Sequence, residues 1–393
     1  MIVKKVLIDR ADRFYQMPPD ILDFARPLLG KPLRSQPEII NLGTSAWPVP
    51  FSEDARILPG SLKPASADKL GLLKESLADW LTQYHGALRI GPREIFLGNG
   101  LSSIMHLIAL TYIDTGDAAL VPSLAVPLYR QAITAAGGVP VPYQLSPRHN
   151  WSPDIEKMSS RIGQAARVLF VNSPHNPTGV DLNEQTFHAF VTMASKQNTL
   201  IVNDACYQSI PPRKPLSLLS IEGGRKVGLE VYSLAYLLGL PPVPFGFAVG
   251  HRSLISGLEQ AGELFGRYIP ELFVDLALDG LKSFPSKSLE QARKRFVAGA
   301  AAIQPLLELL RLETSSPLTI PFIWARVPGR RNSVAFSRLL LKRYRIMVAP
   351  GTGFGEVGQG YIRLSLAASK EEYAECINRV SARTRANRRG GAS

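Results

Sequence analysis

Short apolar runs alternate with helical patterns through the middle of the chain, and this alternation restricts the fold more than any other feature. The strand-like runs are 119–121, 167–171, 199–202 and 227–232, and the helical stretches between them include 101–112 and 185–197. Such alternation predicts a mostly parallel sheet with helices on both faces. Ligands of such folds bind beyond the carboxyl ends of the strands, so the loops there are where we look for chemistry.

The chain of 393 residues is too long for one simple core, and we expect two lobes. An arm of residues 1–40 is expected to precede a large ligand-binding domain of residues 41–275. Residues 276–393 are expected to form a smaller α/β domain with a basic tail. The stretch 253–281 between the lobes reads as helical. The elements expected after it are helices over 288–311 and 333–344 and strands over 322–327 and 361–366.

Composition excludes several classes of protein. The formal net charge of +13 would suit an anionic partner, but much of the clustering lies in residues 379–389, a pattern typical of a solvated chain end. Without helix-turn-helix or zinc-finger spacing, we expect no nucleic-acid partner. No apolar run approaches the roughly eighteen residues of a membrane span, and a secretory signal is not expected. Cys206 and Cys376 alone give no disulfide framework and no metal cluster, which favours a cytoplasmic setting.

Polar motifs follow the predicted strands. Ser-Pro-His-Asn-Pro-Thr-Gly spans residues 173–179, and Asn-Asp-Ala-Cys-Tyr spans 203–207. A carboxylate at a buried strand end, such as Asp204, needs a partner. Near the C-terminus, the planar fork of Arg363 suits a carboxylate ligand. The turn 98–103 leads into a helix whose first N–H groups favour an anion, although a plain strand-to-helix turn has the same appearance.

Together these segments resemble class I and II aminotransferases, especially the histidinol-phosphate and aspartate aminotransferase-like branches, from Asn41 onward. The resemblance implies a three-layer α/β fold with a mostly parallel sheet in the large domain and a smaller α/β C-terminal domain. It also implies pyridoxal phosphate and a homodimer. In the family, the counterparts of Asn176 and Tyr207 contact the phenolic oxygen of the cofactor, and that of Asp204 pairs with its pyridine nitrogen. The remaining positions that the resemblance implies are Gly100, Leu101, Ser102 and Ser233 at the cofactor and Arg363 and Gly43 at the substrate carboxylate.

The resemblance fails at the cofactor. Val-Tyr-Ser-Leu-Ala-Tyr at 231–236 resembles the Ser-Phe-Ser-Lys-x-Tyr signature, so Leu234 stands where the family has the lysine that holds the cofactor. Lys226 is eight residues away, about 26 Å along an extended strand, and no other lysine precedes Lys282. The other departures are prolines at 241–244 in place of the phosphate-binding arginine, Val126 at the ring-stacking position, and no tyrosine within 58–69.

Three hypotheses remain open. The first is a divergent enzyme that acts on an amino acid or small carboxylate with non-covalent pyridoxal or pyridoxamine phosphate, or with no cofactor. Its base would then be another group, for which Tyr207, Tyr236 and His175 are weak candidates. The second is a non-catalytic protein of the same fold that binds a carboxylate or a partner subunit. The third is a conventional aminotransferase that uses a lysine elsewhere in the chain.

Overall fold

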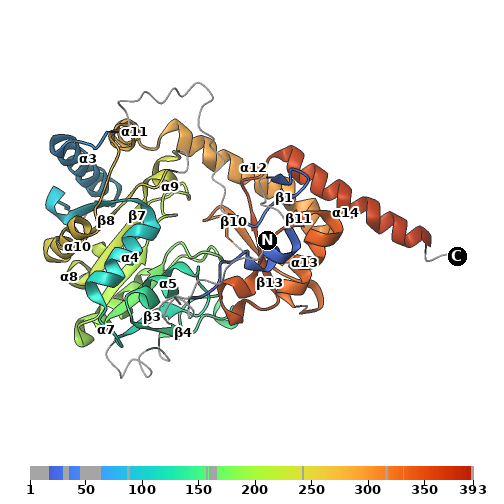
Figure 1. The fold of residues 1–393 in the computed structure, drawn as a ribbon, viewed down its shortest axis with the longest axis horizontal. Coiled ribbons are helices and arrows are strands. Elements are labelled where there is room, and N and C mark those ends of the chain that lie inside the picture. The colour runs from blue at the N-terminus through green and yellow to red at the C-terminus, as the bar shows by residue number, and fades with distance from the viewer. Residues whose placement is uncertain are drawn as a thin grey trace, which may run out of the picture.

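The computed structural model describes residues 17–29, 35–44, 63–85, 89–155, 158, 166–240, 243–314, 317–330 and 332–390. These residues form two lobes joined by the long helix α12 (Lys287–Leu309), which contacts α9 (Leu234–Leu238) of one lobe and α14 (Lys370–Gly390) of the other (Figure 1). Pro241 and Pro242, at the predicted position of the phosphate-binding arginine, lie outside the described residues.

The large lobe contains a seven-stranded sheet in the order β2-β8-β7-β6-β5-β3-β4. Its strands are β2 (Ile95–Gly98), β3 (Ala118–Pro122), β4 (Val139–Tyr143), β5 (Val168–Asn172), β6 (Leu200–Asp204), β7 (Gly228–Ser233) and β8 (Gly246–Gly250). Only β8 runs antiparallel to its neighbours within this sheet. The mostly parallel sheet predicted from the apolar runs is therefore confirmed.

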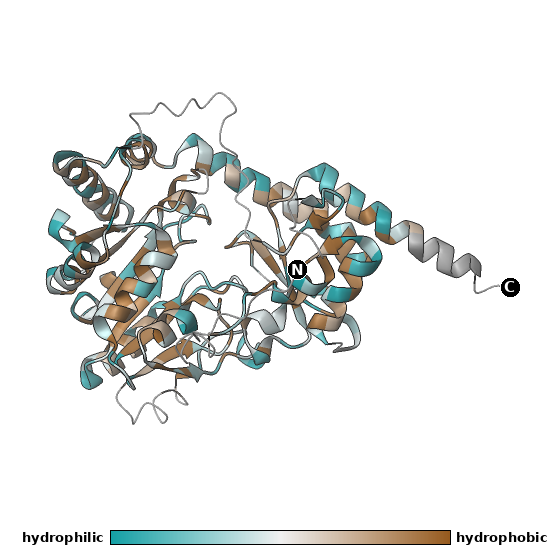
Figure 2. Cartoon of the chain, in the orientation of Figure 1, coloured by the Kyte–Doolittle hydropathy of each residue, from teal (hydrophilic) through white to brown (hydrophobic). Residues whose placement is uncertain are grey.

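Helices cover both faces of this sheet because its strands carry apolar side chains on both sides. In β2, Ile95 and Leu97 pack in one hydrophobic cluster, whereas Phe96 between them packs in another. The first cluster is covered by α3 (Ala67–His85), α9 and α11 (Glu271–Lys282), and the second by α4 (Gly100–Tyr112), α5 (Leu128–Ala135) and α10 (Arg252–Leu264). Helices α7 (Glu184–Gln197) and α8 (Gly224–Val227) pack near the β5 and β6 side. Figure 2 shows hydrophilic residues on helices α3 and α10, which lie on the outer side of this lobe.

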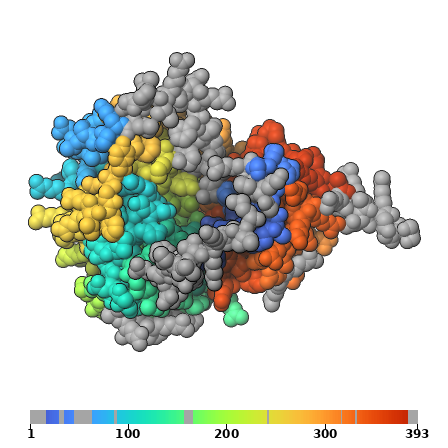
Figure 3. All heavy atoms as spheres, in the orientation of Figure 1, coloured from blue at the N-terminus to red at the C-terminus, as the bar shows by residue number. Residues whose placement is uncertain are grey.

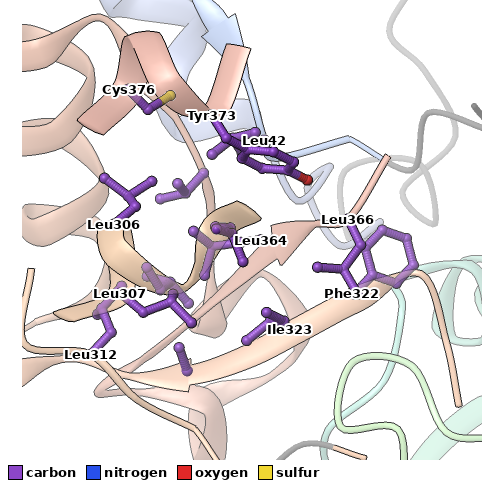
Figure 4. Close-up of a cluster of buried hydrophobic side chains, with 14 of the residues drawn as sticks. Leu42, Leu306, Leu307, Leu312, Phe322, Ile323, Leu364, Leu366, Tyr373 and Cys376 are labelled. Atoms are coloured by element: carbon purple, nitrogen blue, oxygen red, sulfur yellow. The ribbon is translucent and has the colours of Figure 1, made fainter. Parts of the chain in front are cut away.

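The smaller lobe contains an antiparallel sheet in the order β12-β13-β10-β9. Its elements are β9 (Glu313–Thr314), β10 (Phe322–Arg326), β12 (Ala349–Pro350) and β13 (Tyr361–Ser365), packed against α12, α13 (Ser333–Tyr344) and α14. The N-terminal segment joins this lobe, with α2 (Arg26–Leu29) and with β1 (Ile40–Asn41) paired to β11 (Ile346–Met347). Figure 4 shows Leu42 of that segment among side chains of the lobe's core, such as Leu364 and Tyr373.

Several elements were not expected from the sequence, and β4 and α3 are two of them. The motif Val-Pro-Val-Pro-Tyr forms β4. Prolines are tolerated in this strand because β4 lies at the sheet edge and pairs only with β3. The helix α3 was also not anticipated. The boundary predicted at residue 275 stays a prediction. Helix α11, which packs on α3, spans that residue.

Candidate functional site

The candidate site lies at the carboxyl ends of β5 and β6, where both lobes meet. Asn172 ends β5 and is the register partner of Asp204, which ends β6. The Asn172 amide donates to the carbonyl oxygens of Pro174 and Asp204, and its Oδ1 accepts the N–H of Asn176 at 2.7 Å. This side chain therefore shapes the turn that presents Asn176. Sequence reasoning missed Asn172 because it reads as one more strand residue.

Arg363 connects the two lobes from its place on β13. Its Nη1 donates to Asn176 Oδ1 at 3.0 Å, and its Nη2 donates to the carbonyl oxygen of Gly43 at 2.9 Å. The guanidinium carbon lies 3.9 Å from the centroid of the Phe322 ring, and Nε is buried without a hydrogen-bond partner in the described structure. Burial lowers the pKa of Arg363 to about 10, so the side chain is still a cation at neutral pH.

Arg363 is only 3% exposed, yet no described carboxylate forms an ion pair with it. Asp20 acts on Arg363 electrostatically but forms no direct ion pair with it. A buried cation without a directly contacting counter-charge is costly, whereas a bound anion would neutralise it. Arg363 and Gly43, which the resemblance places at the substrate carboxylate, contact each other in the structure, and the arginine has the chemistry of a carboxylate-binding group.

Asp204 is the acidic group of the site. Its Oδ2 accepts a hydrogen bond from the Tyr129 hydroxyl at 2.6 Å, and its Oδ1 accepts the N–H of Cys206 at 3.2 Å. Burial raises the pKa of Asp204, and these hydrogen bonds partly oppose that rise. The Tyr129 ring stacks on Phe170 with centroids 5.5 Å apart. Burial holds the pKa of Tyr129 well above its usual value, so this hydroxyl remains a donor.

The three weak candidates for a base differ in their surroundings. His175 contacts the carbonyl oxygen of Leu124 through Nε2 and the hydroxyl of Thr178 through Nδ1, both at 2.8 Å. Because a carbonyl only accepts, Nε2 carries the proton and Nδ1 accepts from Thr178, which leaves neither nitrogen available. Burial also lowers the pKa of His175 to about 4.

The two tyrosines are stacked edge to face, with the centroids of Tyr207 and Tyr236 5.0 Å apart. The Asn176 amide donates to the Tyr207 hydroxyl at 3.3 Å. Burial holds the pKa of Tyr207 well above its ordinary value, so this phenol stays protonated at neutral pH. Tyr207 is thus suited to hydrogen bonding with a ligand oxygen rather than to removing a proton.

Leu234 follows the end of β7 directly and begins α9. Its side chain is fully buried in the apolar cluster that includes Ala205, Leu238 and Phe245. Its N–H donates to the carbonyl oxygen of Phe245. The position lies at the same edge of the sheet as Asp204 but supplies only hydrocarbon.

The start of α4 lies at this edge as well. Gly98 pairs with Gly246, and Gly246 pairs with Ser233, so two strand spacings, roughly 10 Å, separate the ends of β2 and β7. Gly100 has a φ of +85°, and a Cβ there would lie 3.2 Å from the backbone of Pro244. The N-cap residue Asn99 makes no side-chain hydrogen bond to the first turn. The N–H groups of Gly100, Leu101 and Ser102 are therefore not capped by that side chain.

One basic residue near this helix start was missed. Arg267 lines a cavity of about 60 Å³ together with Gly98, Asn99 and Ser103, and its Nη1 donates to the carbonyl oxygen of Leu97 at 3.3 Å. Arg267 also pairs with Glu259 at 2.6 Å. Arg267 lies more than twenty residues after the prolines at the predicted arginine position, so nothing in the sequence marked it. Val126 is half-buried and packs between two apolar clusters.

The sequence matches the family of aminotransferases of class I and II over residues 66–380. Together with the fold and the site, this match defines the class: the chain belongs to the class I and II aminotransferase family. Membership implies pyridoxal phosphate as the cofactor.

Relatives of known name are aminotransferases. The LL-diaminopimelate aminotransferase of Halothermothrix orenii is 27% identical over 383 residues, which cover 95% of this chain and 98% of the relative. That of Dehalococcoides mccartyi (strain BAV1) is 29% identical over 331 residues, covering 82% and 84%. Among solved structures, substrate-bound BacF from Bacillus subtilis has a TM-score of 0.85 at 23% identity, covering 95% of this chain and 97% of that one. The aspartate aminotransferase of Rhizobium meliloti has a TM-score of 0.84 at 19% identity, covering 95% and 98%. These structures share the fold.

The described donors fit part of pyridoxal phosphate. Asp204 suits the pyridine nitrogen, Asn176 and Tyr207 suit the phenolic oxygen, and the first turn of α4 suits the phosphate. Residue 234, where the resemblance predicts the lysine that links to the cofactor, is a leucine and carries no amine.

Two features are absent from the part of the chain that the structure describes. No helix there is long and apolar enough to cross a membrane. No group of three or more His, Cys, Asp or Glu side chains there could hold a metal ion.

Proposed function

We propose that this protein binds an amino acid or another small carboxylate through Arg363 and acts on it without a lysine at residue 234. The observation that carries the binding proposal is the buried Arg363 cation, which has only neutral hydrogen-bond acceptors, Asn176 Oδ1 and the carbonyl oxygen of Gly43. A ligand carboxylate would supply the missing charge with the bidentate geometry that arginine favours. Because the named relatives are LL-diaminopimelate aminotransferases, LL-diaminopimelate is the first ligand to try.

The proposed cofactor is pyridoxal or pyridoxamine phosphate held without a covalent bond, with a cofactor-free site as the alternative. When bound, the ring supplies an electron sink at the substrate carbon. Asp204 would hold the ring nitrogen, Asn176 and Tyr207 would orient the phenolic oxygen, and Arg363 would fix the substrate carboxylate beside the ring. We propose a homodimer as the working state, as the family resemblance implies, and a cytoplasmic setting, which the presence of only two cysteines favours.

A conventional aminotransferase is the second candidate, and the names of the relatives support it more directly than they support the first. It requires a lysine from outside residues 227–281, since that stretch contains none. A non-catalytic carboxylate-binding or partner protein is the third candidate. Such a protein would bind its ligand through Arg363 but would not convert it.

Absorption spectra with added pyridoxal phosphate, followed by borohydride reduction and peptide mapping, separate these candidates. We expect a non-covalent complex that dialysis removes and no reduced adduct on any single lysine. A stoichiometric adduct on one lysine, with transaminase turnover lost when that lysine is replaced, would establish the conventional candidate instead.

Calorimetry with amino acids and 2-oxo acids, including LL-diaminopimelate, tests the role of Arg363. Binding should fall at least about a hundredfold in Arg363→Ala, because a charge-assisted bidentate contact is lost. The matched control is Arg326→Ala on the neighbouring strand β10, whose side chain pairs with Glu313 at 3.7 Å. Equal affinity in wild type and Arg363→Ala would refute the assignment. Saturable binding without turnover of any ligand in the panel would favour the non-catalytic candidate.

A further inference from the structure

A second hollow lies away from the candidate site, between α3, α11, the start of α12 and the loop that follows β6. It has a volume of about 1140 Å³, and none of its lining residues belongs to the site around Asp204 and Arg363. Helices α3 and α11 contact each other along one edge of the large lobe (Figure 1). In the space-filling view their surfaces adjoin at the end of the molecule opposite α14 (Figure 3).

Three aromatic side chains form one wall of this cavity. The rings of Trp80 and Tyr84 are stacked with centroids 4.8 Å apart, and the Phe284 ring stands edge-on 5.2 Å from each. Tyr84 and Phe284 are only partly buried, so they offer apolar surface to the cavity. Such a wall suits the flat or branched apolar body of a small molecule.

One polar group of this aromatic wall lacks a hydrogen-bond partner in the described structure. Trp80 is 6% exposed, and its indole N–H has no hydrogen-bond partner in the described structure. Buried donors are nearly always satisfied, and each exception calls for an explanation. An acceptor atom on a ligand in the cavity would provide one after a small movement of the ring.

Basic residues gather at the Tyr84 end of the cavity. Arg213, Lys214 and Arg293 line it there, and both arginines act electrostatically on the Tyr84 hydroxyl, whose pKa burial nonetheless raises to about 12. Arg213 pairs with Asp181, and Arg293 donates to the carbonyl oxygen of Ser209. Lys214 is exposed and forms no ion pair with a described carboxylate.

Acidic residues line the same cavity from the two helices. Asp79 comes from α3, and Asp275 and Asp279 come from α11. Asp275 pairs with Lys69, whereas exposed Asp79 forms no ion pair with a described basic side chain. Asp79 lies five residues before Tyr84, roughly 7.5 Å along the helix axis. The cavity thus offers a cationic end, an aromatic wall and an anionic side.

We propose that this cavity is a second binding site, separate from the catalytic one, for a zwitterionic small molecule with a large apolar body. An α-amino acid with an aromatic side chain has this chemistry. Its carboxylate would face Lys214 and Arg293, its ammonium group would face Asp79, and its ring would pack on Tyr84 and Phe284. Asp275 and Asp279 pair with Lys69 and with Lys282, which also lines the cavity. A purely anionic ligand would therefore leave Asp79 as the lining carboxylate without an ion-pair partner among the described residues, whereas an ammonium group would neutralise it.

Three indole compounds with different charges test this proposal by calorimetry: L-tryptophan, indole-3-propionate and tryptamine. They are titrated into Arg363→Lys, which keeps a cation at the first site but lacks the bidentate fork. We expect L-tryptophan to bind at one site about tenfold more tightly than either analogue. Weaker binding of L-tryptophan than of indole-3-propionate would overturn the zwitterion assignment, and no saturable binding of any probe would overturn the site.

Two surface substitutions assign the ends of the ligand. Lys214→Gln should weaken L-tryptophan and indole-3-propionate by about fivefold and leave tryptamine unchanged. Asp79→Asn should weaken L-tryptophan and tryptamine to the same extent and leave indole-3-propionate unchanged. Lys196→Gln, an exposed lysine on α7, is the matched control and should change nothing. If neither Lys214→Gln nor Asp79→Asn alters L-tryptophan binding, the ligand is elsewhere and the proposal fails.

Discussion

The Tyr129 hydroxyl donates a hydrogen bond to the buried carboxylate of Asp204. Removing this hydroxyl should therefore lower the free energy of unfolding more when Asp204 is ionised than when it is protonated. The bond is 2.6 Å long, and both residues are almost completely excluded from solvent. A hydrogen bond to a charged group contributes about 1.5–3 kcal/mol, against about 0.5–1.5 kcal/mol for a neutral pair. Tyr129→Phe keeps the ring on Phe170 and deletes only the donor.

The direction in which this loss of stability changes with pH follows from the pKa of Asp204. Burial already raises its folded pKa, and losing the Tyr129 donor removes one of the contacts that lower it. A raised folded pKa gives stability that is present below the unfolded value, about 3.9, and is lost as pH rises through the folded value. The loss in Tyr129→Phe should therefore be about 0.5–1.5 kcal/mol near pH 4 and about 1.5–3 kcal/mol at neutral pH.

Urea unfolding of the ligand-free protein across this pH range measures the effect. Tyr143→Phe is the matched control, because the Tyr143 hydroxyl is also buried but donates to a neutral carbonyl, that of Phe170, at 3.1 Å. That variant should lose a similar, small free energy at every pH. Equal, pH-independent losses in the two variants would refute the claim that Asp204 is an ionised acceptor in the folded protein.

Substitutions at two more positions of the same site give further predictions. Leu234→Ala should lower the free energy of unfolding by about 2–5 kcal/mol, while Leu234→Met should cost less than about 1.5 kcal/mol, both by urea titration, because residue 234 is fully buried in an apolar cluster. A small loss in Leu234→Ala would mean that this side chain is not packed. Asp204→Asn should stabilise the ligand-free protein by on the order of 1 kcal/mol at neutral pH, and the gain should vanish near pH 4, where the wild-type carboxyl is protonated. A loss of stability at neutral pH would contradict the direction of the pKa shift.

The parts of the site that could be predicted from the sequence share one property. Asn176, Asp204 and Tyr207 each follow an apolar run that became a buried strand, and parallel strands bring their carboxyl ends to one edge. Arg363 was predicted from the chemistry of its side chain and from the family resemblance, and its contacts with Asn176 and Gly43 join it to the same edge.

Other parts could not be predicted because nothing local marks them. Arg267 reaches the start of α4 only through the packing of α10, and Asn172 acts through its side-chain hydrogen bonds to a turn. The prolines of β4 are unfavourable within a central strand, and only the sheet order shows that β4 is an edge strand, where they are tolerated. The second cavity is assembled from four segments between residues 72 and 293, and no spacing in the chain relates them.

The contrast between Leu234 and the rest of the site has a physical meaning. A leucine there adds to the apolar cluster, which stabilises the fold, whereas Asp204 and Arg363 are buried ionisable groups that cost stability in the absence of a ligand. If the site had simply been lost, substitution of these two groups by neutral residues would be favourable. Both groups act electrostatically on Tyr207. Their presence in one buried site is the stronger reason to look for a charged ligand, and it holds whether or not catalysis uses a lysine.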